Sequence, residues 1–299
     1  MFFHPRHILL FQLTVIFALG LTSCASLFGP RAALTPTGPA ATPLPPTATA
    51  EPAAATVNGE VISVAEFQAE LARYKASERA RGATVTDQDA SKIVLEDLIA
   101  QVLLAQGAKA AGFTLTESAL QSRIDALTTQ LGGADKLSAW ESAHGYTDAS
   151  FRSALALSVE AAWMRDKIAN AVPKTADQVH VQQILLYNAN DAQSVLNQLK
   201  SGADFSTLAA QYDPSANGDL GWFPKGYLLD PKVEAAAFSL QVGQFSDVIQ
   251  TDAGYIIIKV LERDAQHPLS PDAYLVLQDN ALKAWVSQQR SQATVVLAP

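Results

Sequence analysis

Asn217-Gly218-Asp219-Leu220-Gly221-Trp222-Phe223-Pro224-Lys225-Gly226 is the most informative stretch of this sequence. It is followed by Glu234-Ala235-Ala236-Ala237-Phe238 and then by Gly254-Tyr255-Ile256-Ile257-Ile258-Lys259-Val260. The glycines of the first stretch indicate tight turns, because glycine adopts positive φ angles at little steric cost. The apolar, β-branched run of the last segment predicts a strand.

The residues around these segments predict a small α+β domain. Three strands are expected from β-branched and apolar content, at 179–186, 246–250 and 254–262. Helices are expected at 191–200, from Gly202-Ala203-Asp204-Phe205 onward, and from Pro231 through Phe238. A loop is expected before Pro231, and the elements of the domain follow the order β-α-α-β-α-β-β.

In their order and spacing, the three segments resemble the signature of parvulin-type, PpiC-like peptidyl-prolyl cis-trans isomerases. The resemblance covers residues 177–267 and implies a compact, FKBP-like antiparallel-sheet domain that acts on X–Pro bonds. Rotation about such a bond must overcome a barrier of about 18–20 kcal/mol. An apolar pocket and a few polar groups can lower that barrier, so we expect no cofactor and no metal.

The resemblance also implies candidate catalytic residues. Asp213 lies at the position that the family fills with Cys or Asp near the isomerising bond; a turn-forming Asp before Pro214 is the alternative. Gln183 and Ile256 occupy the positions of two family histidines that face each other across adjacent strands. Gln183 can still form hydrogen bonds, whereas Ile256 cannot. We therefore predict Asp213 and Gln183 as the catalytic residues.

The expected substrate pocket is apolar. Leu228 lies where the family has a Met or Leu lining the proline pocket, and Val233 lies where a Phe usually forms its floor. The full set of predicted substrate-binding residues is Leu220, Trp222, Phe223, Leu228, Val233, Phe238 and Ile256. We expect Trp222 and Phe223 to be half core and half pocket rim. Strand alternation places His180 on the face opposite Gln183.

Residues 57–176 predict a helical module that is completed by residues 268–299. The Asn-Gly pair within Val57–Ile62 predicts a hairpin with a type I′ turn. Helices are expected after Ser63-Val64-Ala65-Glu66, at about 87–111, 117–131 and 148–170, around Leu137 and Trp140, and in a C-terminal segment at about 271–299. The hairpin-then-helices order resembles the N-terminal module of SurA-like and PrsA-like foldases, which implies a cradle for unfolded polypeptide with the parvulin domain inserted. Alternatively, the apolar stripes of these helices form only the core.

The N-terminus predicts export and a lipid anchor. Ile8 to Leu21 is an apolar run of the length typical of a signal peptide and too short to span a bilayer. It ends in Leu21-Thr22-Ser23-Cys24, which resembles the lipobox of bacterial lipoproteins and implies cleavage after residue 23 and lipidation of Cys24. An ordinary signal peptide or an uncleaved anchor is the alternative. Residues 24–56 are rich in Pro, Thr and Ala, which predicts an extended tether.

Composition excludes several classes of protein. The chain has 299 residues, a net charge of −8 and no basic run, so nucleic acid is not an expected partner. Its five histidines show no metal-binding spacing, and its single cysteine excludes an internal disulfide. We expect unfolded or nascent secreted polypeptides with X–Pro bonds as partners, outside the cytoplasm at a bacterial membrane. Three functions stay open: a lipid-anchored isomerase, a non-catalytic holdase with a degenerate parvulin domain, and a surface adaptor.

Overall fold

The computed structural model describes residues 52–298. The predicted signal peptide, Cys24 and most of the predicted tether lie outside these residues. The predicted end of the tether at residue 56 is wrong, because Ala53–Val57 forms the first strand, β1. Both Ala55 and Val57 are buried. The helical module therefore begins earlier than residue 57.

The predicted N-terminal hairpin is present. β1 pairs with β2 (Glu60–Ser63), and the intervening Asn58 and Gly59 have φ angles of 52° and 87°, as a type I′ turn requires. On its other side β1 pairs with β7 (Val295–Leu297), so the sheet order is β2-β1-β7. The prediction of helix up to residue 299 is thus wrong: helix α9 spans Pro271–Gln292, and a strand follows it.

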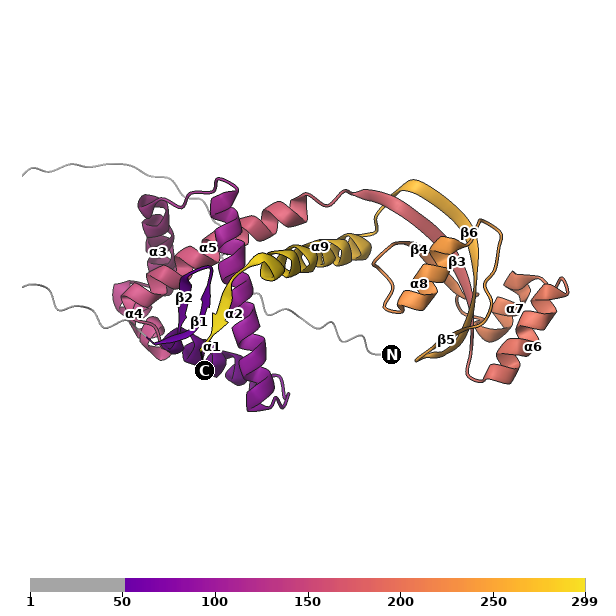
Figure 1. Cartoon of the computed structure of the whole chain (residues 1–299), viewed down its shortest axis with the longest axis horizontal. Coiled ribbons are helices and arrows are strands. Elements are labelled where there is room, and N and C mark those ends of the chain that lie inside the picture. The colour runs from indigo at the N-terminus through magenta and orange to yellow at the C-terminus, as the bar shows by residue number, and fades with distance from the viewer. Residues whose placement is uncertain (1–51, 299) are drawn as a thin grey trace, which may run out of the picture. The chain divides into compact units, whose positions relative to one another are not determined.

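The other predicted helices of this module are confirmed. They are α1 (Val64–Ala80), α2 (Asp87–Ala110), α3 (Glu117–Leu131), α4 (Ala134–Ala143) and α5 (Asp148–Asn170), labelled in Figure 1. Ser63, Thr86, Thr116 and Thr147 accept backbone N–H groups at four of their N-termini, which explains why these starts could be predicted. Phe67, Leu71 and Tyr74 of α1 pack against the cluster that contains Val57 and Ile62, so this stripe contributes to the core.

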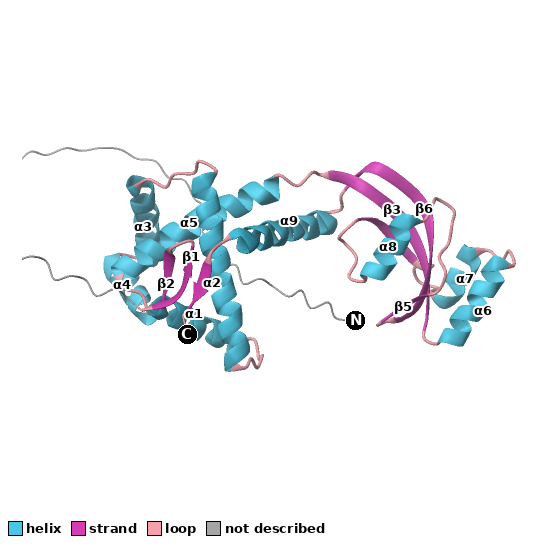
Figure 2. Cartoon of the chain, viewed as in Figure 1, coloured by secondary structure: helices cyan, strands magenta, loops and turns pink. Residues whose placement is uncertain are grey.

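The second sheet consists of β3 (Thr175–Leu186), β4 (Asp219–Pro224), β5 (Ile249–Thr251) and β6 (Gly254–Pro268). Its order is β4-β3-β6-β5, and all pairs are antiparallel. Figure 2 shows its strands in magenta and the helices beside them in cyan. β3 and β6 pair from Thr175 with Pro268 to Leu186 with Tyr255. Both strands are longer than predicted, and β5 is shorter.

Helices cover both faces of this sheet. Helices α6 (Ala189–Lys200) and α7 (Phe205–Tyr212) pack with Ile184, Leu186 and Ile257 on one face. Helix α8 (Pro231–Ser239) packs with Val179, Val181 and Ile258 on the other, which we call the α8 face. This arrangement confirms the predicted α+β class and the order of elements in the domain.

Candidate functional site

Most of the predicted substrate-binding residues lie in one cluster on the α8 face. The cluster contains Leu220, Phe223, Leu228, Val233, Phe238 and Ile256. Val233 and Ile256 are buried and Phe223 is completely inaccessible, whereas Leu220, Leu228 and Phe238 are partly buried. Accessible apolar surface in this cluster therefore comes mainly from the last three residues, and the others form the layer beneath it.

Trp222 and Phe223 do not share the half-core, half-rim position that we predicted. Phe223 points into the α8-face cluster and leaves no surface for a ligand. Successive side chains of a strand point to opposite faces. Trp222 accordingly stacks between His180 and His267, with ring centroids 5.5 and 4.0 Å away. Trp222 therefore does not belong to the cluster that contains Leu228 and Val233.

Gln183 and Ile256 occupy unlike surroundings. Ile256 is packed into the α8-face cluster. Gln183 is half-buried, and its backbone N–H donates to the carbonyl of Gly218 over 2.8 Å. The buried amide of the neighbouring Gln182 instead faces the other way, donating to the carbonyl of Asn217 and accepting from the Ser206 hydroxyl. Since side chains alternate along β3, the side chain of Gln183 points to the α8 face.

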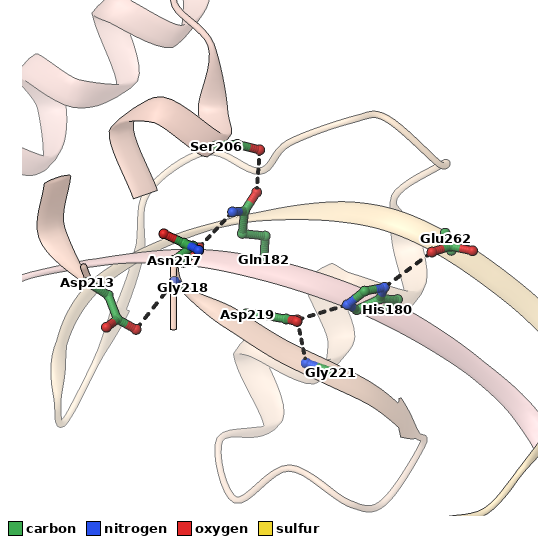
Figure 3. A network of polar contacts seen from close by, with 9 residues as sticks. All are labelled: His180, Gln182, Ser206, Asp213, Asn217, Gly218, Asp219, Gly221 and Glu262. Atoms are coloured by element: carbon green, nitrogen blue, oxygen red, sulfur yellow. Dashed lines mark hydrogen bonds and ion pairs between the residues drawn. The ribbon is translucent and has the colours of Figure 1, made fainter. Parts of the chain in front are cut away.

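Asp213 organises the loop between α7 and β4. Its Oδ1 accepts from the Ser215 hydroxyl and from the N–H groups of Ser215 and Ala216, over 2.7–3.2 Å. Its Oδ2 accepts from the Gly218 N–H over 3.3 Å (Figure 3). The Ser215 hydroxyl, followed by these N–H groups, lowers the pKa of Asp213. The turn-forming role that we gave as the alternative is therefore present in the structure.

Gly218 explains why this loop needs glycine. Its φ angle is 69°, and a Cβ at this position would lie 2.0 Å from the carbonyl oxygen of Gln183. The loop backbone therefore passes directly against β3 at the level of the candidate catalytic residue. Any side chain at residue 218 would force the two segments apart.

Glu234 is a candidate positioning residue that sequence reasoning missed. Its Oε2 accepts the backbone N–H groups of Gly226, Tyr227 and Leu228 over 2.8, 3.1 and 3.2 Å. One carboxylate thus holds the turn that carries Leu228. The glutamate lies in the first turn of α8, after the Asp230 cap, and that position alone gave no indication of the turn it binds.

The opposite side of the sheet carries a polar network around His180, as strand alternation predicted. The Nε2 of His180 lies 2.8 Å from Asp219 Oδ1, and its Nδ1 lies 3.4 Å from Glu262 Oε1 (Figure 3). Asp219 Oδ1 also accepts the Gly221 N–H over 2.8 Å. Partial burial acts to raise the pKa of Asp219, but the bonds from Gly221 and His180 outweigh burial and lower it.

Comparison with known protein families assigns both parts of the chain. Residues 173–262 match the model of the PPIC-type PPIase domain, and residues 46–137 match that of the SurA-like N-terminal domain. This chain joins a SurA-like N-terminal domain to a PPIC-type PPIase domain. The predicted family resemblance is thereby confirmed, and the polar and apolar residues described above from Gln183 to Ile256 lie within the PPIC-type domain.

Individual relatives carry foldase names. Foldase protein PrsA of Geobacillus sp. (strain WCH70) is 38% identical over 112 residues, which cover 36% of this chain and 39% of that protein. Foldase protein PrsA of Caldanaerobacter subterraneus subsp. tengcongensis is 28% identical over 232 residues, which cover 68% of this chain and 71% of that protein. A crystal structure of the peptidylprolyl isomerase PrsA from Bacillus cereus is similar with a TM-score of 0.43 and 22% identity, covering 78% of this chain and 83% of that one.

The extent of these matches differs between relatives. Over the first three, the matched region spans 27–39% of the relative's own length. Within residues 52–298, no helix has both the length and the apolar content needed to cross a membrane.

Proposed function

We propose that this protein is a peptidyl-prolyl cis-trans isomerase that acts on X–Pro bonds of unfolded or nascent polypeptides. The observation that carries the proposal is the apolar cluster of the α8 face, where Leu228 borders Val233 and Ile256 inside a PPIC-type PPIase domain. An amide that leaves water for such surroundings loses the hydrogen bonds that stabilise its planar, charge-separated form. Rotation about the bond then becomes easier.

Each site residue has a defined part in this proposal. Leu228, supported by Val233 beneath it, contacts the proline ring. The amide of Gln183 forms a hydrogen bond with the substrate carbonyl or with the proline nitrogen as that nitrogen becomes pyramidal. Asp213 holds the loop that borders the pocket, and its ionised carboxylate adds negative potential near the rotating bond.

We also propose that the protein works outside the cytoplasm on a bacterial cell membrane. The lipobox-like Leu21-Thr22-Ser23-Cys24 supports lipidation of Cys24 after removal of residues 1–23. The Pro-rich segment that follows would separate the folded part from the bilayer. The foldase names of the relatives support unfolded polypeptides as clients.

A holdase without catalysis is the second candidate. It is favoured by Gln183 and Ile256, which stand where the family has its two facing histidines. The SurA-like N-terminal domain supplies a separate module that could bind unfolded chains.

Turnover of an Ala-Pro or Leu-Pro peptide by the full chain tests the two candidates, beside suppression of aggregation of an unfolded protein. Leu228→Ala should lower kcat/KM about tenfold, because lost apolar contacts in a pocket cost about 1–3 kcal/mol. Leu229→Ala is the matched control, since Leu229 is 86% exposed and should leave kcat/KM unchanged.

Asp213→Ala should also lower turnover, through the loop that it holds. Equal activity of the wild type, the Leu228→Ala variant and the Asp213→Ala variant would contradict the site assignment. Absence of turnover together with clear aggregation suppression would favour the holdase.

A further inference from the structure

The sheet carries a stacked array of rings on the side opposite the α8 face. His180 of β3, Trp222 of β4 and His267 of β6 stack in that order, with interplanar angles of 25° and 10°. His180 is largely buried, with 19% of its side-chain surface accessible. Nothing in the proposed isomerase site uses these rings directly.

The hydrogen-bonding capacity of His180 makes this array sensitive to protonation. Both ring nitrogens face a carboxylate oxygen, Nε2 that of Asp219 and Nδ1 that of Glu262. A neutral imidazole has only one N–H group, so it can donate to only one of the two. The imidazolium donates to both, and these bonds are strengthened by charge. Only the imidazolium can therefore donate to both carboxylates in the observed geometry.

The charged groups around His180 are few and can be named. Asp219 faces it from the start of β4, and Glu262 faces it from β6. The indole of Trp222 separates it from His267, whose Nδ1 lies 3.5 Å from Asp264. Arg263, which follows Glu262 on β6, is paired with Asp177. Protonation of His180 therefore adds a positive charge between two carboxylates.

The polar network connects His180 to the loop of the proposed site. Asp219 Oδ1 also accepts the N–H of Gly221. The residue that precedes Asp219, Gly218, donates its N–H to Asp213 and accepts the N–H of Gln183 with its carbonyl. The short segment from residue 217 to 221 is thus held by Asp213 at one end and by the His180–Asp219 pair at the other (Figure 3). This backbone therefore connects the His180–Asp219 pair to the loop that Asp213 holds.

We propose that His180 is a positioning residue for the isomerase site, and that its protonation tightens the 217–221 segment and raises activity as the pH falls. This inference rests on the proposed isomerase function. Histidine side chains change charge between about pH 5 and 8. A neutral ring donates to only one of the two carboxylates and without charge assistance, so it holds the segment less firmly.

The test is the pH profile of kcat/KM of the full chain between about pH 5 and 8.5. We expect the wild type to lose activity about threefold to tenfold with rising pH, with an inflection in the histidine range. His180→Gln, which cannot be protonated, should show a flat profile near the high-pH level of the wild type. His267→Gln is the matched control: it removes a ring from the same stack without touching Asp219 and should keep the inflection.

A flat wild-type profile, or an inflection that survives His180→Gln, would overturn the inference. The amide resonance of Gly221 gives a readout that needs no turnover. If no peptide is isomerised at any pH, a Gly221 amide that titrates in the wild type and not in His180→Gln still supports the coupling, and only the isomerase function fails. A Gly221 amide that does not respond to pH overturns the coupling itself.

Discussion

The two faces of the second sheet divide the expected chemistry between them. The α8 face has an apolar cluster with Leu228, Val233 and Ile256. The Glu234 carboxylate supports the turn beside it. The opposite side carries His180, His267 and the carboxylates that face them. Family resemblance would place two histidines on the α8 face. In this chain, residues 217–221 link the two sides, because Gly218 binds Asp213 and Gln183 while Gly221 binds Asp219.

The largest expected effect comes from Gly218→Ala, which disrupts the packing of the 217–221 segment against β3. A Cβ at residue 218 would lie 2.0 Å from the carbonyl oxygen of Gln183. The loop would have to leave β3 and lose its bond to Gln183, at a cost of at least about 3 kcal/mol in the free energy of unfolding. Thermal or urea unfolding of the variant measures this loss.

Gly221→Ala is the matched control. Gly221 has the same φ angle of 69°, but a Cβ there would meet no atom within 4 Å. Only the strain of a left-handed conformation remains, which costs about 1–2 kcal/mol. Equal destabilisation by the two substitutions would show that the contact with β3 is unimportant.

Glu234→Gln should have the next largest effect and act on the α8 face alone. The charged Oε2 accepts three backbone N–H groups of residues 226–228, and a neutral amide holds them more weakly. We expect a loss of about 1–2 kcal/mol in stability and a raised KM for the Pro peptide, because Leu228 is no longer held in place. Steady-state kinetics and thermal unfolding check both.

Glu262→Gln makes the same chemical change on the other side of the sheet. At about pH 8.5, above the histidine range, it should leave KM unaltered. If Glu262→Gln raised KM as much as Glu234→Gln at that pH, the two faces would not be independent in the way the structure indicates.

Local signals in the sequence predicted much of the fold. The type I′ turn at Asn58-Gly59 and the helix starts at Thr86 and Thr147 depend on neighbouring residues only, so they could be recognised. Strand β7 was missed because it exists only through pairing with β1, far away in the sequence. The full lengths of β3 and β6 were also missed. Their polar ends contain few strand-forming residues and are strands because they pair with each other.

The site was predicted less completely than the fold. The resemblance identified the residues that gather around Leu228. It did not show that Trp222 and Phe223 point to opposite sides of β4. Glu234 was missed because its bonds depend on how the 226–228 turn closes over α8. Asp219 and His180 meet only after β3 and β4 pair, so neither their contact nor their link to Gly221 is visible in the sequence.

The smallest expected effect concerns acid stability and the Asp213 carboxylate. The pKa of Asp213 in the folded protein is lowered by the Ser215 hydroxyl and the loop N–H groups. The contribution of Asp213 to stability is therefore present above the unfolded pKa of about 4. That contribution is lost as the pH falls through the lower folded pKa. Asp213→Asn should therefore melt earlier than the wild type at about pH 6, and the difference in Tm should shrink toward about pH 3. A difference in Tm that is constant over this range would mean that the Asp213 carboxylate holds the loop by shape rather than by charge.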